Sequence, residues 1–185
     1  RDYYASRGLG DVYKRQNKNT AIHYAKGCSL TSLDTSGIAE AVEAAKNSEV
    51  AVIFGGSASA ALARDYKSST CGERFDLNDL NLTGAQSQLI REVYRTGTPV
   101  ILVLVTGKPF VIEWEKNNLP AILVQWYAGE QAGNSIADIL FGEVVPSGRL
   151  TFSFPRSTGH LPVYYNYLPS DRGSVSYTHL TLPTN

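Results

Sequence analysis

The residues best suited to chemistry are charged side chains in an irregular stretch around residues 64–76. Glu73 stands in the segment "SSTCGERFDL", with Arg64, Asp65 and Asp76 nearby. A loop carboxylate can be an ordinary solvated charge, or it can donate and accept protons during a reaction. The residue types alone leave both interpretations open, so the surrounding elements must decide between them.

Continuous apolar runs rich in β-branched residues, each ending at a turn signal, are typical of buried parallel strands. Three such runs occur, at residues 50–56, 99–107 and 120–127. Helical patterns alternate with them, at residues 34–49, 83–97, 109–118 and 129–142. This alternation predicts an α/β fold with a mostly parallel sheet and helices on both faces, a three-layer α/β sandwich.

Local signals predict further details of these elements. Residues 20–27 form a short β-prone run that ends at a glycine. A residue of 34–36 is expected to cap the first helix, and Thr83 to cap the second, because short oxygen-bearing side chains satisfy the first backbone N–H groups. Pro109 is expected in the first turn of the third helix, where its missing N–H is tolerated.

Ligands of open α/β sheets bind outside the carboxyl ends of the strands. That rule selects the loops at residues 55–79, 106–108 and 126–130. The first is by far the longest, and a loop of about twenty residues inside a compact domain is usually functional or disordered. Glu73 lies within it, so its context favours a functional role more strongly than its residue type does.

Other candidates keep simpler interpretations. Trp126 and Tyr127 follow a strand and could form the floor of a sugar site or pack in the core. Glu130 is expected in the first turn of a helix, where its charge suits the helix dipole. The run "FGGSASA" lacks the full G-x-G-x-x-G pattern of a dinucleotide site. The histidines His23 and His160 and the two cysteines show no metal-ligand spacing, and the cysteines are expected as free thiols.

The bulk composition points to no charge-driven partner. The chain has 185 residues, with 17 basic and 17 acidic side chains and a net charge of zero. Neither nucleic acid nor an anionic membrane is therefore expected as a partner. No apolar run approaches the roughly 18 residues that a membrane-spanning helix needs.

The segments at both ends of the chain can be traced back to DNA sequences that do not belong to a natural gene. Residues 6–16, "SRGLGDVYKRQ", and residues 175–184, "VSYTHLTLPT", can each be read as an in-frame translation of DNA that resembles a transposon-type sequencing adaptor. Such segments are excluded from fold reasoning. Residues 1–16 and 174–185 are therefore expected to be adaptor-derived, and residues 17–173 to be the natural segment, a truncated domain.

Several motifs of this segment together resemble the C-terminal α/β-sandwich domain of family 3 glycoside hydrolases, of the bacterial β-glucosidase and β-xylosidase type. They are "CGERFDLNDLNLTGAQSQLI", "GTPVILVLVTGKPFVI" and the long run that starts "PAILVQWYAGEQAGNSIADILFGEVVPSGRL". The resemblance implies a retaining β-glycosidase acting on terminal β-linked glucosides or xylosides, with no cofactor and no metal. It also implies a periplasmic or secreted location.

In that family the nucleophile is an aspartate on a preceding barrel domain, and the acid/base is a glutamate on a loop of the sandwich domain. Counting back from Leu80, Leu82 and Gln86 places the acid/base on Glu73. The resemblance gives Asp76 a family match, whereas Leu77 stands where many members carry arginine. The nucleophile is expected to be absent from this chain. A noncatalytic carbohydrate-binding module and a nucleotide-binding domain are the alternatives.

Overall fold

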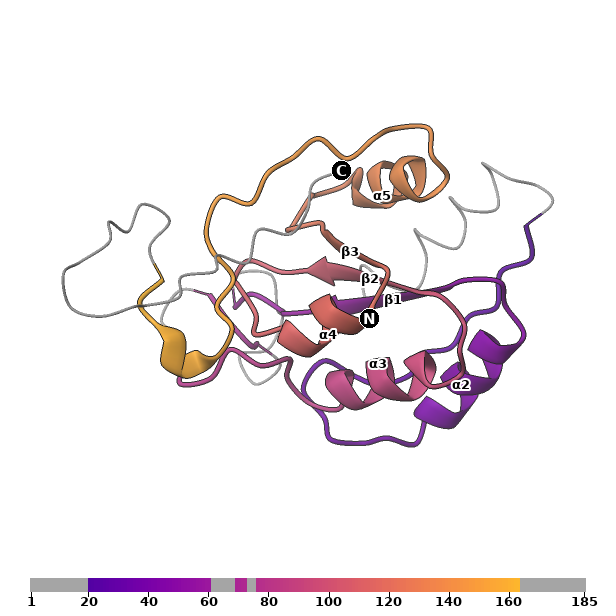
Figure 1. Ribbon diagram of the computed structural model, residues 1–185, viewed down its shortest axis with the longest axis horizontal. Helices are drawn as coiled ribbons and strands as arrows, with labels where there is room; N and C mark the ends of the chain where they lie inside the picture. Colours follow the sequence, from indigo (N-terminus) through magenta and orange to yellow (C-terminus); the bar gives the residue numbers. More distant parts are fainter. Residues whose placement is uncertain (1–19, 61–68, 73–75, 164–185) are drawn as a thin grey trace.

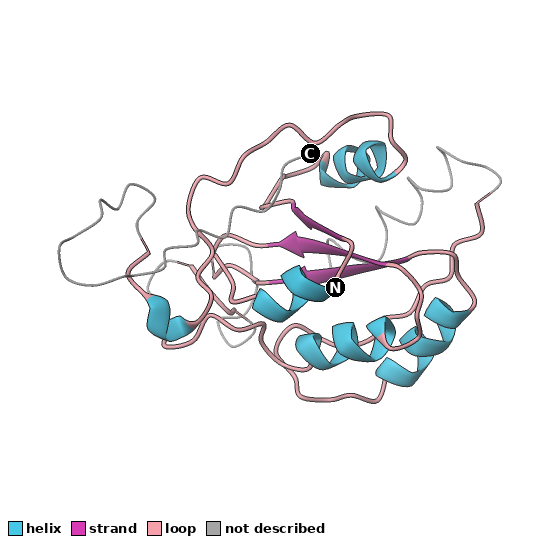
Figure 2. Ribbon diagram, viewed as in Figure 1, coloured by secondary structure: helices cyan, strands magenta, loops and turns pink. Residues whose placement is uncertain are grey.

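The computed structural model describes residues 20–60, 69–72 and 76–163. Their elements follow in the order α2 (Ile38–Lys46), β1 (Ala51–Gly56), α3 (Gln86–Tyr94), β2 (Val100–Val105), α4 (Glu113–Asn118), β3 (Ala121–Val124), α5 (Ala132–Leu140) and the short 3₁₀ helix η2 (Thr158–His160). The three predicted buried runs contain the three strands, and a helix lies between each strand and the next (Figure 1, Figure 2).

The strands form one parallel sheet in the order β1-β2-β3. In its register, Ala51 pairs with Val100 and Gly56 with Val105, while Ile101 pairs with Ala121. Parallel neighbours need a crossover connection, which α3 and α4 provide. The predicted α/β fold with a parallel sheet is thereby confirmed. Figure 1 shows α2, α3 and α4 together, with β3 between them and α5.

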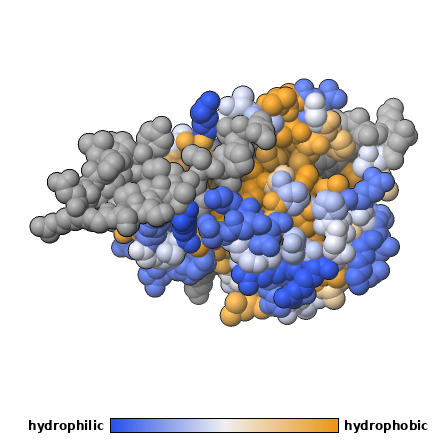
Figure 3. All heavy atoms as spheres, viewed as in Figure 1, coloured by the Kyte–Doolittle hydropathy of each residue, from blue (hydrophilic) through white to orange (hydrophobic). Residues whose placement is uncertain are grey.

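The core lies where α2, α3 and the segment before α4 pack on the sheet. The central strand β2 is its most enclosed element, since Leu102, Val103 and Leu104 are completely buried. Helix α3 places Ile90 and Val93 in this core. On the face shown in Figure 3, hydrophilic residues predominate in the lower half, whereas hydrophobic ones gather in the upper part. This packing holds the carboxyl ends of the strands in a fixed register.

Two helix caps differ from the sequence-based expectation. The N-cap residue of α2 is Gly37, without a side-chain cap, because the Asp34 carboxylate instead accepts hydrogen bonds from the Ser36 N–H and hydroxyl. The N-cap of α3 is Ala85. The Thr83 hydroxyl donates to the Leu30 carbonyl oxygen at 2.6 Å, so a tertiary contact uses it. Both predicted caps were wrong, because Asp34 bonds a residue two positions along the chain and Thr83 bonds a distant one.

Two further predictions about elements were also wrong. Residues 20–27 form no strand, and within this run only Gly27 makes an isolated bridge, to Gly37. Helix α4 begins at Glu113, well after Pro109, because Phe110 and Ile112 are drawn fully into the core ahead of the helix. In both places the tertiary environment outweighed the local preference.

Candidate active-site edge

The loops that follow the three strands meet at one edge of the sheet. Ser57 directly follows β1, Thr106 follows β2, and Tyr127 comes shortly after β3. The Ser57 hydroxyl lies 2.9 Å from the Thr106 hydroxyl and 2.9 Å from the Tyr127 hydroxyl. The structure thus brings together the loops that the strand-end rule selected.

The long loop after β1 is closed at its base by backbone hydrogen bonds. The Ala60 N–H donates to the Cys71 carbonyl oxygen at 2.8 Å, and the Thr70 N–H donates to the Ala58 carbonyl oxygen at 2.8 Å. The Thr70 hydroxyl also accepts from the Ala58 N–H at 2.9 Å. These contacts surround an isolated parallel β-bridge between Ser59 and Cys71, called the stem below, so the loop leaves the sheet and returns at a defined place.

Tyr127 joins the two sides of this stem. Its hydroxyl lies 2.9 Å from the Ser57 hydroxyl, 3.2 Å from the Ser57 carbonyl oxygen and 3.4 Å from the Cys71 sulfur. Burial is the largest cause that raises the pKa of Tyr127, to about 12. The phenol is therefore a neutral hydrogen-bonding group at physiological pH.

Gln86, the first residue of α3, holds the end of β1. Its Oε1 accepts from the Gly56 N–H at 2.7 Å, and its Nε2 donates to the Gly56 carbonyl oxygen at 3.1 Å. The same Nε2 lies 3.2 Å from the Leu30 carbonyl oxygen. The side chain is almost completely buried. Gln86 thereby provides hydrogen-bond partners for the Gly56 N–H and carbonyl oxygen, because these two groups face away from β2.

Lys108 is a buried cation beside the same edge. Only 7% of the residue is exposed, and Nζ lies 4.7 Å from the centre of the Phe110 ring. Within the described ranges, Nζ has no hydrogen-bond partner. Burial lowers the pKa of Lys108, while the nearby Cys71 and Asp79 oppose that shift. Its backbone is fixed by Thr106, whose hydroxyl donates to the Lys108 carbonyl oxygen and accepts from its N–H.

Most of the predicted site residues lie outside the described residues. These are Glu73, Arg64 and Asp65. Asp76 is described and is exposed. Glu73 directly follows Gly72, where the stem ends. The described ranges hold no group of three or more metal-ligating side chains. The structure therefore describes the chain up to Gly72, the residue before Glu73, at the edge where the Ser57, Thr106 and Tyr127 hydroxyls meet.

The aromatic and charged residues after β3 have different environments. Trp126 packs on the core and makes an edge contact with Phe152, with ring centres 5.1 Å apart. This supports the core-packing interpretation of Trp126. Glu130 is exposed and lies before Gln131, the N-cap residue of α5, so its predicted place in the first helical turn was wrong. The use of the Tyr127 hydroxyl was not predicted, because residues 57 and 127 meet only in the folded chain.

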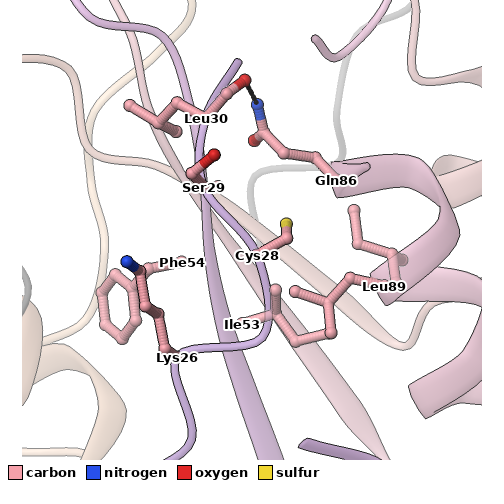
Figure 4. Close-up of a pocket in the computed structure, with 10 residues that line it drawn as sticks. Lys26, Cys28, Ser29, Leu30, Ile53, Phe54, Gln86 and Leu89 are labelled. Carbon is pink, nitrogen blue, oxygen red and sulfur yellow. Dashed lines mark hydrogen bonds between the residues drawn. The ribbon is translucent and has the colours of Figure 1, made fainter. Parts of the chain in front are cut away.

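A small hollow lies between the segment at residues 26–30, β1 and α3 (Figure 4). Cys28 lines it, and burial raises the pKa of this free thiol. The hollow has a volume of about 30 Å³, far below the roughly 300 Å³ of the smallest typical small-molecule sites. The end of β1 beside it continues into the paired stem rather than into a helix N-terminus. This geometry does not fit the dinucleotide alternative.

Comparison with known proteins gives the chain a family. Residues 4–180 match the glycosyl hydrolase family 3 C-terminal domain. The chain belongs to glycosyl hydrolase family 3. The resemblance inferred from the motifs is thereby confirmed. The matched range extends into both end segments, whose adaptor origin and boundaries at residues 16/17 and 173/174 stay predictions.

The relatives in this family are longer glycosidases. A β-xylosidase of Formosa agariphila is 42% identical over 183 residues, which are 97% of this chain and 24% of that protein. A periplasmic β-glucosidase of Salmonella typhimurium is 44% identical over 137 residues, 73% of this chain and 16% of that protein. The chain therefore spans about a quarter or less of the length of these relatives.

Solved structures of the family share the fold. A β-glucosidase of Erythrobacter marinus superposes with a TM-score of 0.74 at 33% identity, covering 94% of this chain and 26% of that one. A β-glucosidase of Listeria innocua in complex with glucose gives 0.69 at 33% identity, covering 80% and 19%. Within the part of the chain that the structure describes, no helix has the length and apolar character needed to cross a bilayer.

Proposed function

We propose that this chain is the acid/base-bearing domain of a retaining β-glycosidase that acts on terminal β-linked glucosides or xylosides. Glu73 is the general acid/base, and an aspartate on a preceding barrel domain is the nucleophile. Arg64, Asp65 and Asp76 contribute to substrate binding from the same loop. The parent enzyme is periplasmic or secreted, in line with the periplasmic β-glucosidase among the relatives.

The reaction requires two carboxyl groups on opposite sides of the glycosidic bond. One attacks the anomeric carbon while the other protonates the leaving oxygen, and the second then activates the water that releases the sugar. In retaining enzymes the two groups lie about 5–5.5 Å apart. Glu73 must be protonated before the first step, and the neighbouring nucleophile carboxylate helps by raising its pKa.

The observation that carries the proposal is the stem at the carboxyl edge of the sheet. It brings Cys71 and Gly72 next to the strand ends, where α/β folds bind ligands, and Glu73 is the next residue along the chain. The relatives are β-xylosidases and β-glucosidases several times longer than this chain, which supports a nucleophile located on another domain. A loop that reaches across a domain boundary can then complete the site.

Glu73→Ala in the complete enzyme tests this role. Loss of a general acid/base lowers turnover by about 10²–10⁴-fold. Azide, a small nucleophile that needs no general base, should restore part of the activity on an aryl glycoside with a good leaving group. The product should be the β-glycosyl azide, identified by NMR. The isolated chain, which lacks the nucleophile, should not hydrolyse the same substrates.

Glu143→Gln is the matched control, because Glu143 is an exposed carboxylate beyond α5. Its activity should equal that of the unchanged enzyme. If Glu73→Ala reduces turnover by only a fewfold, or azide has no effect, the acid/base lies elsewhere. Titration of the isolated chain with cellobiose or xylobiose tests the alternative of a carbohydrate-binding module, which requires measurable affinity.

A further inference from the structure

The loop at residues 29–34, which leads into α2, presents an apolar side chain to solvent. Leu33 at its tip is 81% exposed, the largest exposed fraction among the large hydrophobic side chains of the described residues. Leu30 in the same loop is 37% exposed, and residues 29–33 carry no charge. A single exposed leucine is ordinary on a protein surface, so the setting of Leu33 must decide whether it has a role.

The backbone of this loop is held against the start of α3. The Leu30 carbonyl oxygen accepts from the Thr83 hydroxyl at 2.6 Å and from Gln86 Nε2 at 3.2 Å (Figure 4). The Ser32 carbonyl oxygen accepts from the Ala85 N–H at 3.0 Å. Leu33 therefore projects from a fixed backbone, and a partner that covers it has little loop motion to suppress.

Several polar groups of the loop bond one another. The Ser29 hydroxyl accepts from the Ser32 N–H at 3.1 Å, and the Ser32 hydroxyl accepts from the Asp34 N–H at 3.0 Å. The Asp34 carboxylate accepts from the N–H and the hydroxyl of Ser36. Polar groups that already have hydrogen bonds cost much less to remove from water than unpaired ones. The loop can therefore be covered at a low desolvation cost.

The loop lies on the side of the sheet where the strands end. Gln86, which bonds Leu30, also bonds Gly56 at the carboxyl end of β1. The proposed function requires a second domain at this edge, and the chain spans about a quarter or less of the length of its relatives, which leaves ample length for one. A fixed apolar side chain surrounded by bonded polar groups is the composition of an interface anchor.

We propose that Leu33 anchors the interface between this domain and the domain that carries the nucleophile, by filling an apolar recess on that domain. This inference rests on the proposed function, which supplies the partner. The contact would fix the sheet edge relative to the partner domain. An error of about 1 Å in the placement of reacting groups can cost about a hundredfold in rate, so such an anchor has a direct consequence for catalysis.

Hydroxyl-radical footprinting of the unchanged protein tests the contact without an activity assay. The oxidation of Leu33, measured by mass spectrometry, is compared between the isolated chain and the complete enzyme. We expect about a fivefold decrease in the complete enzyme, because a side chain that is 81% exposed becomes nearly buried at an interface core. Equal oxidation in the two forms would overturn the anchor.

Val145 is the matched control for the footprinting. It is 73% exposed and follows α5, which runs back from the end of β3 in Figure 1, so it lies away from the carboxyl edge. Its oxidation should be the same in the isolated chain and the complete enzyme. If Val145 and Leu33 are protected to the same extent, the protection is not specific to the loop and the anchor is overturned.

Leu33→Asp tests the consequence for catalysis. The urea midpoint of the isolated chain should stay unchanged, because the side chain is exposed there. In the complete enzyme kcat/KM should fall by at least about tenfold, since a charge cannot enter an apolar recess without a large cost, whereas Val145→Asp should have no effect. An unchanged kcat/KM for Leu33→Asp, or a lower urea midpoint of the isolated chain, would contradict the anchor.

Glu73→Ala, measured in parallel, separates this inference from the proposed function. If Glu73→Ala stalls turnover and Leu33 is oxidised equally in both forms, the anchor is overturned and the proposed function stands. If Glu73→Ala retains turnover while Leu33 alone is protected, the proposed function is overturned and the interface at Leu33 is supported.

Discussion

Replacing Gln86 with leucine is expected to destabilise the chain by about 3 kcal/mol. Gln86 is 3% exposed, and its amide pairs with both the N–H and the carbonyl oxygen of Gly56. Leucine has a similar size but offers no hydrogen bond, so both backbone groups become buried and unpaired. Each such group costs about 1–3 kcal/mol, and the greater apolar burial of leucine offsets about 1 kcal/mol.

Urea denaturation followed by tryptophan fluorescence measures this change. With a slope of about 2 kcal/mol per molar urea, the midpoint should fall by about 1.5 M. Gln88→Leu is the matched control, since Gln88 is an exposed glutamine on the same helix. A surface substitution of that kind usually changes stability by less than about 0.5 kcal/mol. Equal midpoints for the two variants would refute the assignment of Gln86 as the anchor of β1.

Two further substitutions test the packing. Burial is the main cause that raises the pKa of Glu115, so the free energy of unfolding should decline as pH rises through that raised pKa. Glu115→Gln should therefore be more stable than the unchanged chain at pH 7, and this difference should shrink near pH 4. Gly56→Ala should cost at least roughly 3 kcal/mol, because φ is +141° and the new Cβ would lie 2.0 Å from the Val105 carbonyl oxygen. Gly97→Ala, at φ +82° with open space around it, should cost only about 1 kcal/mol by the same urea assay, and equal losses would contradict the steric argument.

The sequence alone was sufficient for the strands and the order of the elements. The apolar runs at residues 50–56, 99–107 and 120–127 contain β1, β2 and β3. Their signal is local, because a strand buried on both faces must be apolar at nearly every position. The motif around Gln86 also has a physical reason, since its amide completes the hydrogen bonds at the end of β1.

The helix starts could not be predicted in this way. Asp34 and Thr83 have side chains that can cap a helix, but Asp34 bonds Ser36 and Thr83 bonds Leu30. A short polar side chain can satisfy several different backbone groups. For Thr83 the partner is 53 residues away and comes near only on folding, whereas Asp34 takes a group only two residues along the chain.

The sequence by itself determined the family, the parallel α/β fold and the choice of Glu73 as the candidate acid/base. Only the tertiary structure decided how the edge around that residue is built. Ser57, Thr106 and Tyr127 are separated by as many as 70 residues, and their hydroxyls meet because the register of β1, β2 and β3 places three strand ends side by side. Hydrogen bonds between distant residues depend on that register, and no local pattern in the chain encodes it.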